Sequence, residues 1–151
     1  MKSGVRGIAA AGFTLAEVVM VLSCAAVVLA AAGPNVGKLY EEWALWGAAR
    51  SVESSLRWGR AQAVSATSPM MFVVDASGGS FYWLNPATGE RFEGSVRYLS
   101  ARVRFVGAPK KPLRFTPRGN ATPAGTFTLQ NGAGSYKVVV SLVGRIRVQR
   151  G

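Results

Sequence analysis

Residues 12–34 of this 151-residue chain read Gly12-Phe13-Thr14-Leu15-Ala16-Glu17, followed by VVMVLSCAAVVLAAAGP. Between residues 13 and 32 the run is almost wholly apolar, and Glu17 carries its one charge. A helix of about twenty residues spans about 30 Å, which is the thickness of the hydrocarbon core of a bilayer. The stretch therefore predicts a membrane-spanning helix near the start of the chain.

Three interpretations of this segment compete. A secretory signal would explain the basic residues Lys2 and Arg6 and an A-x-A cleavage site at residues 30–32, but it would place Glu17 inside the apolar region. A plain membrane anchor also leaves Glu17 unexplained, because a lone carboxylate in lipid costs about 2.5–3.5 kcal/mol. The third interpretation gives this carboxylate a partner.

The third interpretation rests on a resemblance. The residues from Gly12 to Glu17 resemble the G-F-T-L-x-E signature of type IV pilins and type II secretion pseudopilins. In that family a prepilin peptidase cuts after the glycine, and the new N-terminal residue is then N-methylated. The resemblance implies cleavage between Gly12 and Phe13 and methylation of Phe13. One position departs from the family, since Ala11 stands where many members have Lys or Arg.

The same resemblance implies assembly functions for Glu17 and Pro34. In a filament, the α-amino group of Phe13 on a neighbouring subunit would supply the cation that Glu17 lacks. A buried charge with one fixed partner specifies register more than it adds stability. Pro34 removes a helical hydrogen bond, so we expect a kink there.

The composition excludes several kinds of active site. The chain has no histidine and one cysteine, so it offers neither an internal disulfide, nor a Cys/His zinc site, nor a Ser-His-Asp or Cys-His catalytic group. With seven Asp and Glu residues in all, a carboxylate metal cage is not expected. We therefore expect a protein that is not an enzyme and that has no metal or cofactor.

The formal net charge is +11, and its distribution along the chain is uneven. Residues 91–151 hold twelve Lys and Arg against Glu93 alone, whereas residues 13–90 are slightly acidic. An even solvating coat would not be arranged in this way. The C-terminal part of the chain therefore predicts an anionic partner.

Residues 35–68 contain no proline and predict an amphipathic helix that ends at Ser68-Pro69. We expect the apolar face, with its tryptophans, to form core rather than a ligand site, and Glu53 and Arg57 to pair on another face. The positions of the expected apolar face are Leu39, Trp43, Trp46, Ala49, Val52, Leu56 and Ala63.

After Pro69 the pattern changes to short β-branched and aromatic runs separated by turn residues. The expected strands are residues 70–75, 81–85, 96–100, 103–106, 113–116, 126–130 and 136–142, with a last one at 145–149. The fold class is α+β, with a long N-terminal helix packed on an antiparallel sheet. The expected divisions are leader 1–12, membrane helix 13–34, amphipathic helix 35–68 and sheet domain 69–151.

The second half is similar to the GspH/FimT branch of the pilin-like family. The similarity is carried by LRWGRAQAV at 56–64, LRFTPRG at 113–119, GTFTL at 125–129, YKVVVS at 136–141 and GRIR at 144–147. Members of this branch are minor pseudopilins of type II secretion or minor type IV pilins. In FimT-like members a Gly-Arg-x-Arg motif binds DNA for uptake, and Gly144-Arg145-Ile146-Arg147 has that pattern.

Two arginines at alternate positions of a strand lie on one face, about 6.6 Å apart, and guanidinium groups suit phosphate oxygens. The DNA-binding hypothesis covers Gly144, Arg145, Arg147, Arg150, Arg114 and Arg118. Nothing in the pattern reads bases, so we expect binding to double-stranded DNA without sequence preference. The alternative is that Gly144 makes a hairpin turn and that the arginines are ordinary solvated positions.

Together these patterns predict a single-pass protein of the bacterial inner membrane with a periplasmic globular domain, which later joins a pilus or pseudopilus. The expected partners are other pilins or pseudopilins, the prepilin peptidase, the membrane and DNA. The alternative is a type II secretion minor pseudopilin with a purely structural function at the tip and no DNA binding.

Overall fold

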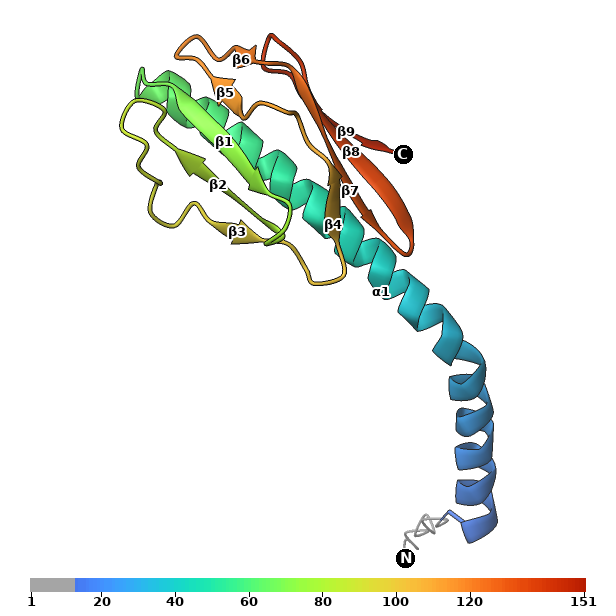
Figure 1. The fold of residues 1–151 in the computed structure, drawn as a ribbon. Coiled ribbons are helices and arrows are strands. Elements are labelled where there is room, and N and C mark those ends of the chain that lie inside the picture. Colours follow the sequence, from blue (N-terminus) through green and yellow to red (C-terminus); the bar gives the residue numbers. More distant parts are fainter. Residues whose placement is uncertain (1–12) are drawn as a thin grey trace, which may run out of the picture. The chain divides into compact units, whose positions relative to one another are not determined.

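The structure is a computed structural model that describes residues 13–151, apart from the side chains of residues 31–35 (Figure 1). The predicted leader 1–12, and with it Gly12, lies outside the described residues. The chain divides into two units, which meet between Gly37 and Lys38. One long helix, α1 (Leu15–Ser65), contributes its first part to one unit and its second part to the other. Pro34 falls within the bounds of α1, and the kink predicted there lies outside what the structure describes.

The first turn of α1 is closed by a capping box between Thr14 and Glu17. The backbone N–H of Glu17 donates to Thr14 Oγ1 at 3.3 Å, and the backbone N–H of Thr14 donates to Glu17 Oε2 at 2.9 Å. This reciprocal pair satisfies donors that a helix start otherwise leaves free. Among the described residues, no helix combines the length and the apolar character needed to cross a membrane.

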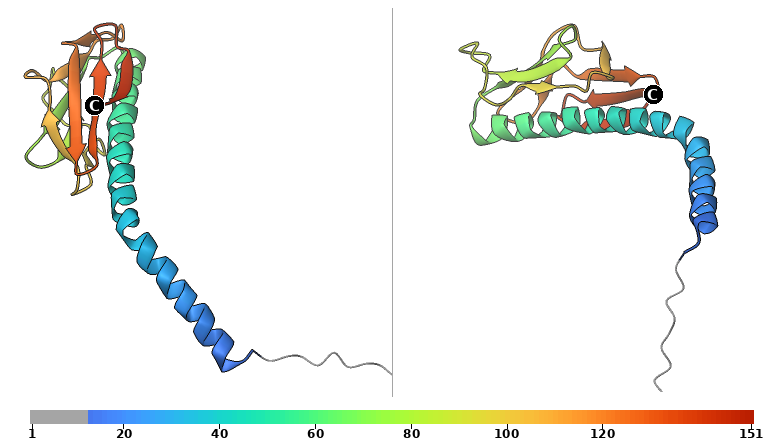
Figure 2. Two further views of the ribbon diagram at one scale, coloured as in Figure 1. Left: turned by 90° about the vertical axis from the view of Figure 1, so that its right-hand side faces the viewer. Right: turned by 90° about the horizontal axis from the view of Figure 1, so that it is seen from below.

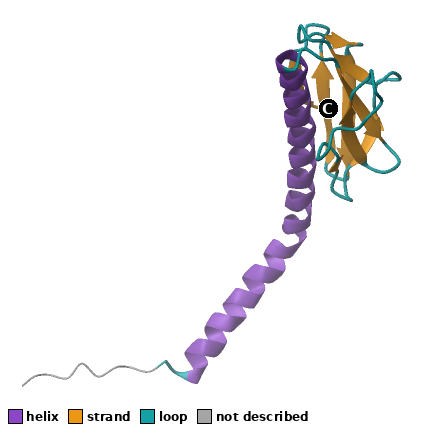
Figure 3. Ribbon diagram, turned by 90° about the vertical axis from the view of Figure 1, so that its left-hand side faces the viewer, coloured by secondary structure: helices purple, strands orange, loops and turns teal. Residues whose placement is uncertain are grey.

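In the second unit, one stripe of α1 is fully buried. Leu45, Ala49, Val52, Leu56 and Ala63 are at most 2% exposed. They follow steps of three, four and seven residues, which keep side chains on one side of a helix. Figure 3 shows this part of the helix lying against the strands.

The expectation that the tryptophan stripe is core is wrong for its first three members. Trp43 is 71% exposed, Trp46 is 52% exposed and Leu39 is 52% exposed. The physical reason is the rotation of side chains around the helix axis. Three residues advance a side chain by about 300°, so each step of three moves it about 60° away from its starting face. Three such steps lead from Trp43 to Val52 and place the two side chains on opposite sides of α1.

The strands form two antiparallel sheets rather than the single sheet that we expected. One has the order β3-β2-β1-β5-β6 and the other has the order β4-β7-β8-β9. Figure 2 shows these strands beside the second part of α1. The strands of the first sheet are β1 (Met70–Asp75), β2 (Ser80–Leu84), β3 (Arg97–Tyr98), β5 (Leu113–Phe115) and β6 (Ala121–Thr122). Those of the second are β4 (Arg104–Gly107), β7 (Gly125–Asn131), β8 (Gly134–Val140) and β9 (Ile146–Arg150).

These elements confirm the α+β class with antiparallel sheets. The bounds of β1 are those expected, and seven other strands fall within three residues of their expected ends. The helix ends at Ser65, three residues earlier than expected, and β6 was not expected at all. Two residues are too few for an alternating pattern to be visible in a sequence.

One hydrophobic core joins α1 to both sheets. Its centre is aromatic: the ring centroid of Phe72 lies 4.9 Å from that of Trp83 and 5.2 Å from that of Phe127. Gly59 of α1 faces the Trp83 ring so closely that a Cβ on Gly59 would overlap it. The absence of a side chain at position 59 therefore lets the helix approach this core.

Candidate functional site

The Gly-Arg-x-Arg motif begins in a tight turn between β8 and β9. The N–H of Gly144 donates to the carbonyl of Ser141 at 2.9 Å, and the N–H of Ser141 donates to the carbonyl of Arg145 at 3.0 Å. Gly144 is buried and has a φ of +74°, a conformation that favours glycine. The hairpin turn offered as the alternative interpretation of Gly144 is thus present.

A second turn, between β5 and β6, lies against the first. The N–H of Gly119 donates to the carbonyl of Thr116 at 2.8 Å, and the N–H of Ala121 donates to the carbonyl of Leu142 at 2.9 Å. A Cβ on Gly144 would overlap the carbonyl oxygen of Gly119. The two turns therefore contact each other directly through backbone atoms.

Arg60 of α1 joins the helix to this pair of turns. Its Nε–H donates to the carbonyl oxygen of Gly119 at 2.9 Å. The same Nε lies 2.6 Å from where a Cβ on Gly144 would be. Residues 60, 119 and 144 are far apart in sequence, and they meet at one point in the fold.

Beside this point lies a cleft of about 1040 Å³, which we call the arginine cleft. One wall comes from the last turns of α1 and the other from the turns before β6 and β9. Among the described residues, no acidic side chain lines it. Its lining residues are Arg57, Arg60, Ala61, Val64, Ser65, Arg118, Val143, Gly144, Arg145 and Ile146.

The structure brings together part of the predicted DNA-binding set. Gly144, Arg145 and Arg118 line the arginine cleft, and Arg147 lies exposed on β9, opposite Val139 of β8. As expected for the other face of that strand, Ile146 and Val148 pack against the core. The remaining predicted residues lie elsewhere: Arg150 reaches Glu42 at 3.5 Å, and Arg114 is exposed on β5 in the other sheet.

Two cleft residues, Arg57 and Arg60, were not predicted as site residues. Arg57 is ion-paired with Glu53 at 2.8 Å, as its spacing predicts, but Glu53 is buried rather than on a solvated face. Burial raises the pKa of the Glu53 carboxyl, and hydrogen bonds and charges from Arg57 and Arg50 outweigh this and lower the pKa below its ordinary value. The signal available in the sequence was the segment LRWGRAQAV, which contains both arginines.

Two of the predicted processing and assembly residues, Phe13 and Glu17, lie at the N-terminal end of α1. Phe13 is 86% exposed and precedes the helix. Glu17 Oε2 accepts hydrogen bonds from the backbone N–H and the hydroxyl of Thr14, at 2.9 and 3.0 Å. Within the described chain, the carboxylate of Glu17 thus has a local partner that the sequence analysis did not identify.

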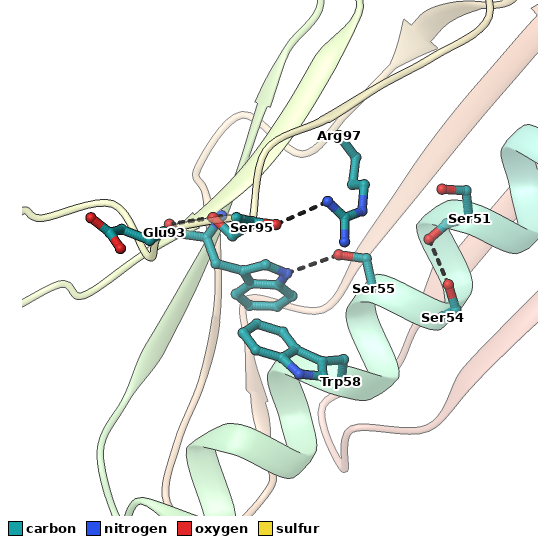
Figure 4. Close-up of a pocket in the computed structure, with 9 residues that line it drawn as sticks. Ser51, Ser54, Ser55, Trp58, Glu93, Ser95 and Arg97 are labelled. Atoms are coloured by element: carbon teal, nitrogen blue, oxygen red, sulfur yellow. Dashed lines mark hydrogen bonds between the residues drawn. The ribbon is translucent and has the colours of Figure 1, made fainter.

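A second hollow, of about 420 Å³, lies between α1 and the segment before β3 (Figure 4). We call it the serine–tryptophan pocket, and it is lined by Ser51, Ser54, Ser55, Trp58, Trp83, Glu93, Gly94, Ser95 and Arg97. The indole N–H of Trp83 donates to Ser55 Oγ at 2.9 Å, and Arg97 donates to the carbonyl of Gly94 at 2.9 Å. The Trp83–Ser55 bond ties the first sheet to the helix, and the Arg97–Gly94 bond lies within the segment before and at β3.

A long N-terminal helix, part of which packs on antiparallel sheets, defines a pilin-like fold. Two solved structures share it. The minor pseudopilin EpsH of the Vibrio cholerae Type 2 Secretion System has a TM-score of 0.60 and 14% identity over 70% of this chain and 96% of its own. The type IV minor pilin FimU of Pseudomonas aeruginosa has a TM-score of 0.59 and 22% identity over 74% of this chain and 92% of its own.

The sequence places the chain more narrowly. The family described as "Type II transport protein GspH" matches residues 48–144, which is more than half of the chain. The chain therefore belongs to the GspH family, and the resemblance seen in the sequence is confirmed. The matched range contains Arg57, Arg60 and Arg118 and ends at Gly144, directly before Arg145. No curated protein matches the chain.

Proposed function

We propose that this protein is a minor pilin or pseudopilin, a structural subunit of a short envelope filament and not an enzyme. The observation that carries the proposal is membership of the GspH family together with the cleavage signature at Gly12-Phe13. In this proposal residues 13–34 anchor the precursor in the inner membrane, and the globular unit lies in the periplasm. The apolar side chains of this segment, such as Leu15 and Leu29, are exposed and free to contact lipid or other subunits.

Processing by a prepilin peptidase is tested at the cleavage site. Gly12→Val should leave residues 1–12 attached, because the peptidase requires a very small residue before the cut. Mass spectrometry of the membrane fraction measures the mature N-terminus. A wild-type chain that begins at Gly33 instead of Phe13 would identify an ordinary secretory signal and would contradict the proposal.

Assembly is tested at Glu17. Glu17→Leu should still insert into the membrane, because a carboxylate has been removed from an apolar segment. It should enter filaments poorly, because the α-amino group of a neighbouring Phe13 then lacks its counter-charge. Thr14→Val is the matched control, since it removes the capping hydroxyl and leaves the carboxylate. Equal amounts of Glu17→Leu and wild type in sheared filaments would exclude the pairing.

The finer part of the proposal is that the basic face binds double-stranded DNA without sequence preference. It is supported by the Gly-Arg-x-Arg pattern and by the exposure of Arg145 and Arg147. Arg145→Ala plus Arg147→Ala should remove most binding of a labelled duplex and leave the melting temperature nearly unchanged. The matched control is Arg91→Ala plus Arg97→Ala, which removes the same charge from exposed positions beside β2 and on β3.

The competing function is a purely structural one at the filament tip. If wild-type protein binds no DNA at low salt, this alternative stands and the basic face contacts filament neighbours. If both arginine pairs weaken binding equally, the effect is one of net charge and the motif is not a site.

A further inference from the structure

The arginine cleft has two walls, and the motif supplies only one of them. Arg118 and Arg145 come from turns between strands, while Arg57 and Arg60 lie one helical turn apart on α1. Glu53 partly neutralises Arg57. Among the described residues, Arg60, Arg118 and Arg145 form no ion pair with a carboxylate. Three cations without a counter-charge therefore surround one hollow.

Arg60 also has a fixed position. Its hydrogen bond to the Gly119 carbonyl uses Nε and leaves the two terminal nitrogens of the guanidinium for another acceptor. A carbonyl acceptor is neutral, so the charge of Arg60 remains uncompensated. The same contact joins α1 to the turn that carries Arg118, and that turn is bonded to the turn that carries Arg145 through the Ala121 N–H and the Leu142 carbonyl. Arg60 is thus both a cleft cation and a positioning residue for the other wall.

We propose that the cleft binds the phosphodiester backbone of DNA between its two walls, and that Arg57 and Arg60 of α1 form half of the site. This rests on the DNA binding proposed above and extends it to the helix. A guanidinium can donate two parallel hydrogen bonds to one phosphate. Each strand of duplex DNA carries one phosphate per about 3.4 Å of helix axis, so one DNA ligand can neutralise several arginines.

The spread of the charges favours a nucleic acid over a lipid headgroup. A phospholipid with a single phosphate would pair with one or two of these arginines and leave the others unpaired. The apolar side chains in the cleft, Val64 and Val143, are 48% and 65% exposed and can contact the sugar faces between phosphates. A sugar-phosphate backbone can therefore contact both the arginines and the apolar side chains of the cleft.

The test compares two pairs of substitutions in the full chain, purified in a nonionic detergent. Arg57→Ala plus Arg60→Ala removes the helix wall, and Arg91→Ala plus Arg97→Ala removes the same charge far from the cleft. Fluorescence anisotropy with a short labelled duplex measures affinity across a salt series. The helix-wall pair should weaken binding at least about tenfold. It should also reduce the slope of log affinity against log salt concentration by about two, because each lost phosphate contact reduces that slope by about 0.9. The control pair should change affinity less than about threefold.

A loss of folding must be separated from a loss of contact. Arg60→Lys keeps the charge but has one nitrogen for both the Gly119 carbonyl and a phosphate, so it should bind DNA more weakly than wild type and more tightly than Arg60→Ala. If thermal melting shows that Arg57→Ala plus Arg60→Ala is unfolded, Arg57→Ala alone replaces it, with Arg91→Ala as its control, because Arg57→Ala leaves the Arg60–Gly119 bond in place.

The outcomes distinguish this proposal from the one on which it rests. Wild-type protein that binds no DNA refutes the DNA-binding function itself. Wild-type binding that the helix-wall pair and the control pair reduce equally refutes the two-walled cleft alone and leaves the motif. The helix-wall pair is also compared with wild type on phosphatidylglycerol vesicles. If this variant loses binding to the vesicles and binds DNA as wild type does, the proposal is overturned and the cleft is assigned to lipid.

Discussion

The serine–tryptophan pocket and the arginine cleft both lie between α1 and the strands, and they differ in the charge of their linings. The pocket contains one carboxylate, Glu93, and one guanidinium, Arg97, and both the Trp83 indole and Arg97 donate hydrogen bonds within the fold. The cleft is lined by four arginines, and the guanidiniums of Arg118 and Arg145 have no carboxylate partner among the described residues. A lining of balanced charge serves cohesion, whereas an excess of positive charge attracts anions.

The largest expected effect concerns the pocket. Trp83→Ala removes a side chain that is 1% exposed and should cost about 3–5 kcal/mol of unfolding free energy. Denaturant unfolding measures the loss. DNA affinity, measured below the lowered melting temperature, should match wild type. A parallel loss of affinity would mean that pocket and cleft are not separate.

A smaller effect is expected where α1 approaches that tryptophan. Gly59→Ala should cost about 1–3 kcal/mol, because the new methyl group overlaps the buried Trp83 ring. Gly47→Ala is the matched control, since a Cβ there meets nothing and the position is exposed on the same helix. It should stabilise the protein by up to about 1 kcal/mol, through the higher helix propensity of alanine. The difference between the two melting temperatures isolates the contact at position 59.

The smallest effect concerns Glu53 beside the cleft. Its pKa is lowered in the folded protein, so its charge contributes stability above the unfolded pKa, and that stability is lost as the pH falls through the folded pKa. Glu53→Gln should therefore be less stable than wild type at neutral pH by about 1 kcal/mol or less, and the difference should vanish in acid below the ordinary value of 4.5. Thermal melting across a pH series measures it.

The same variant sharpens the contrast between the two hollows. Removing the carboxylate that pairs with Arg57 frees a cation of the cleft, so Glu53→Gln should bind DNA more tightly than wild type while being less stable. Weaker DNA binding by this variant would show that the salt bridge positions Arg57 for its ligand.

Local patterns made much of the fold predictable. The β-branched and aromatic residues of β1 and the turn residues that separate the strands are features of short, contiguous segments. The helix stripe failed at Trp43 and Trp46 because steps of three were treated as one face, although they rotate around the helix. The capping box of Thr14 and Glu17 could have been recognised, because its spacing is itself a local pattern.

The site was predictable on one side. Arg145 was found because its motif is contiguous, and Arg118 because it is a basic turn residue. Arg57 and Arg60 looked like ordinary positions of a helix, since their place in the cleft depends on contacts with residues about 60–90 positions away. The division of the strands into two sheets is likewise a long-range property of pairing.

The rotation that separates the exposed tryptophans from the buried stripe has a further consequence. Trp43 and Trp46 point in a fixed direction around the helix axis, because continuous helix connects them to the buried Val52. One residue inserted between Gly47 and Ala48 would swing both rings by about 100° and shift them by about 1.5 Å, leaving Leu56 and Ala63 in place. A single insertion or deletion in α1 can therefore change the direction in which Trp43 and Trp46 face. A substitution at either position changes only the side chain that is presented there.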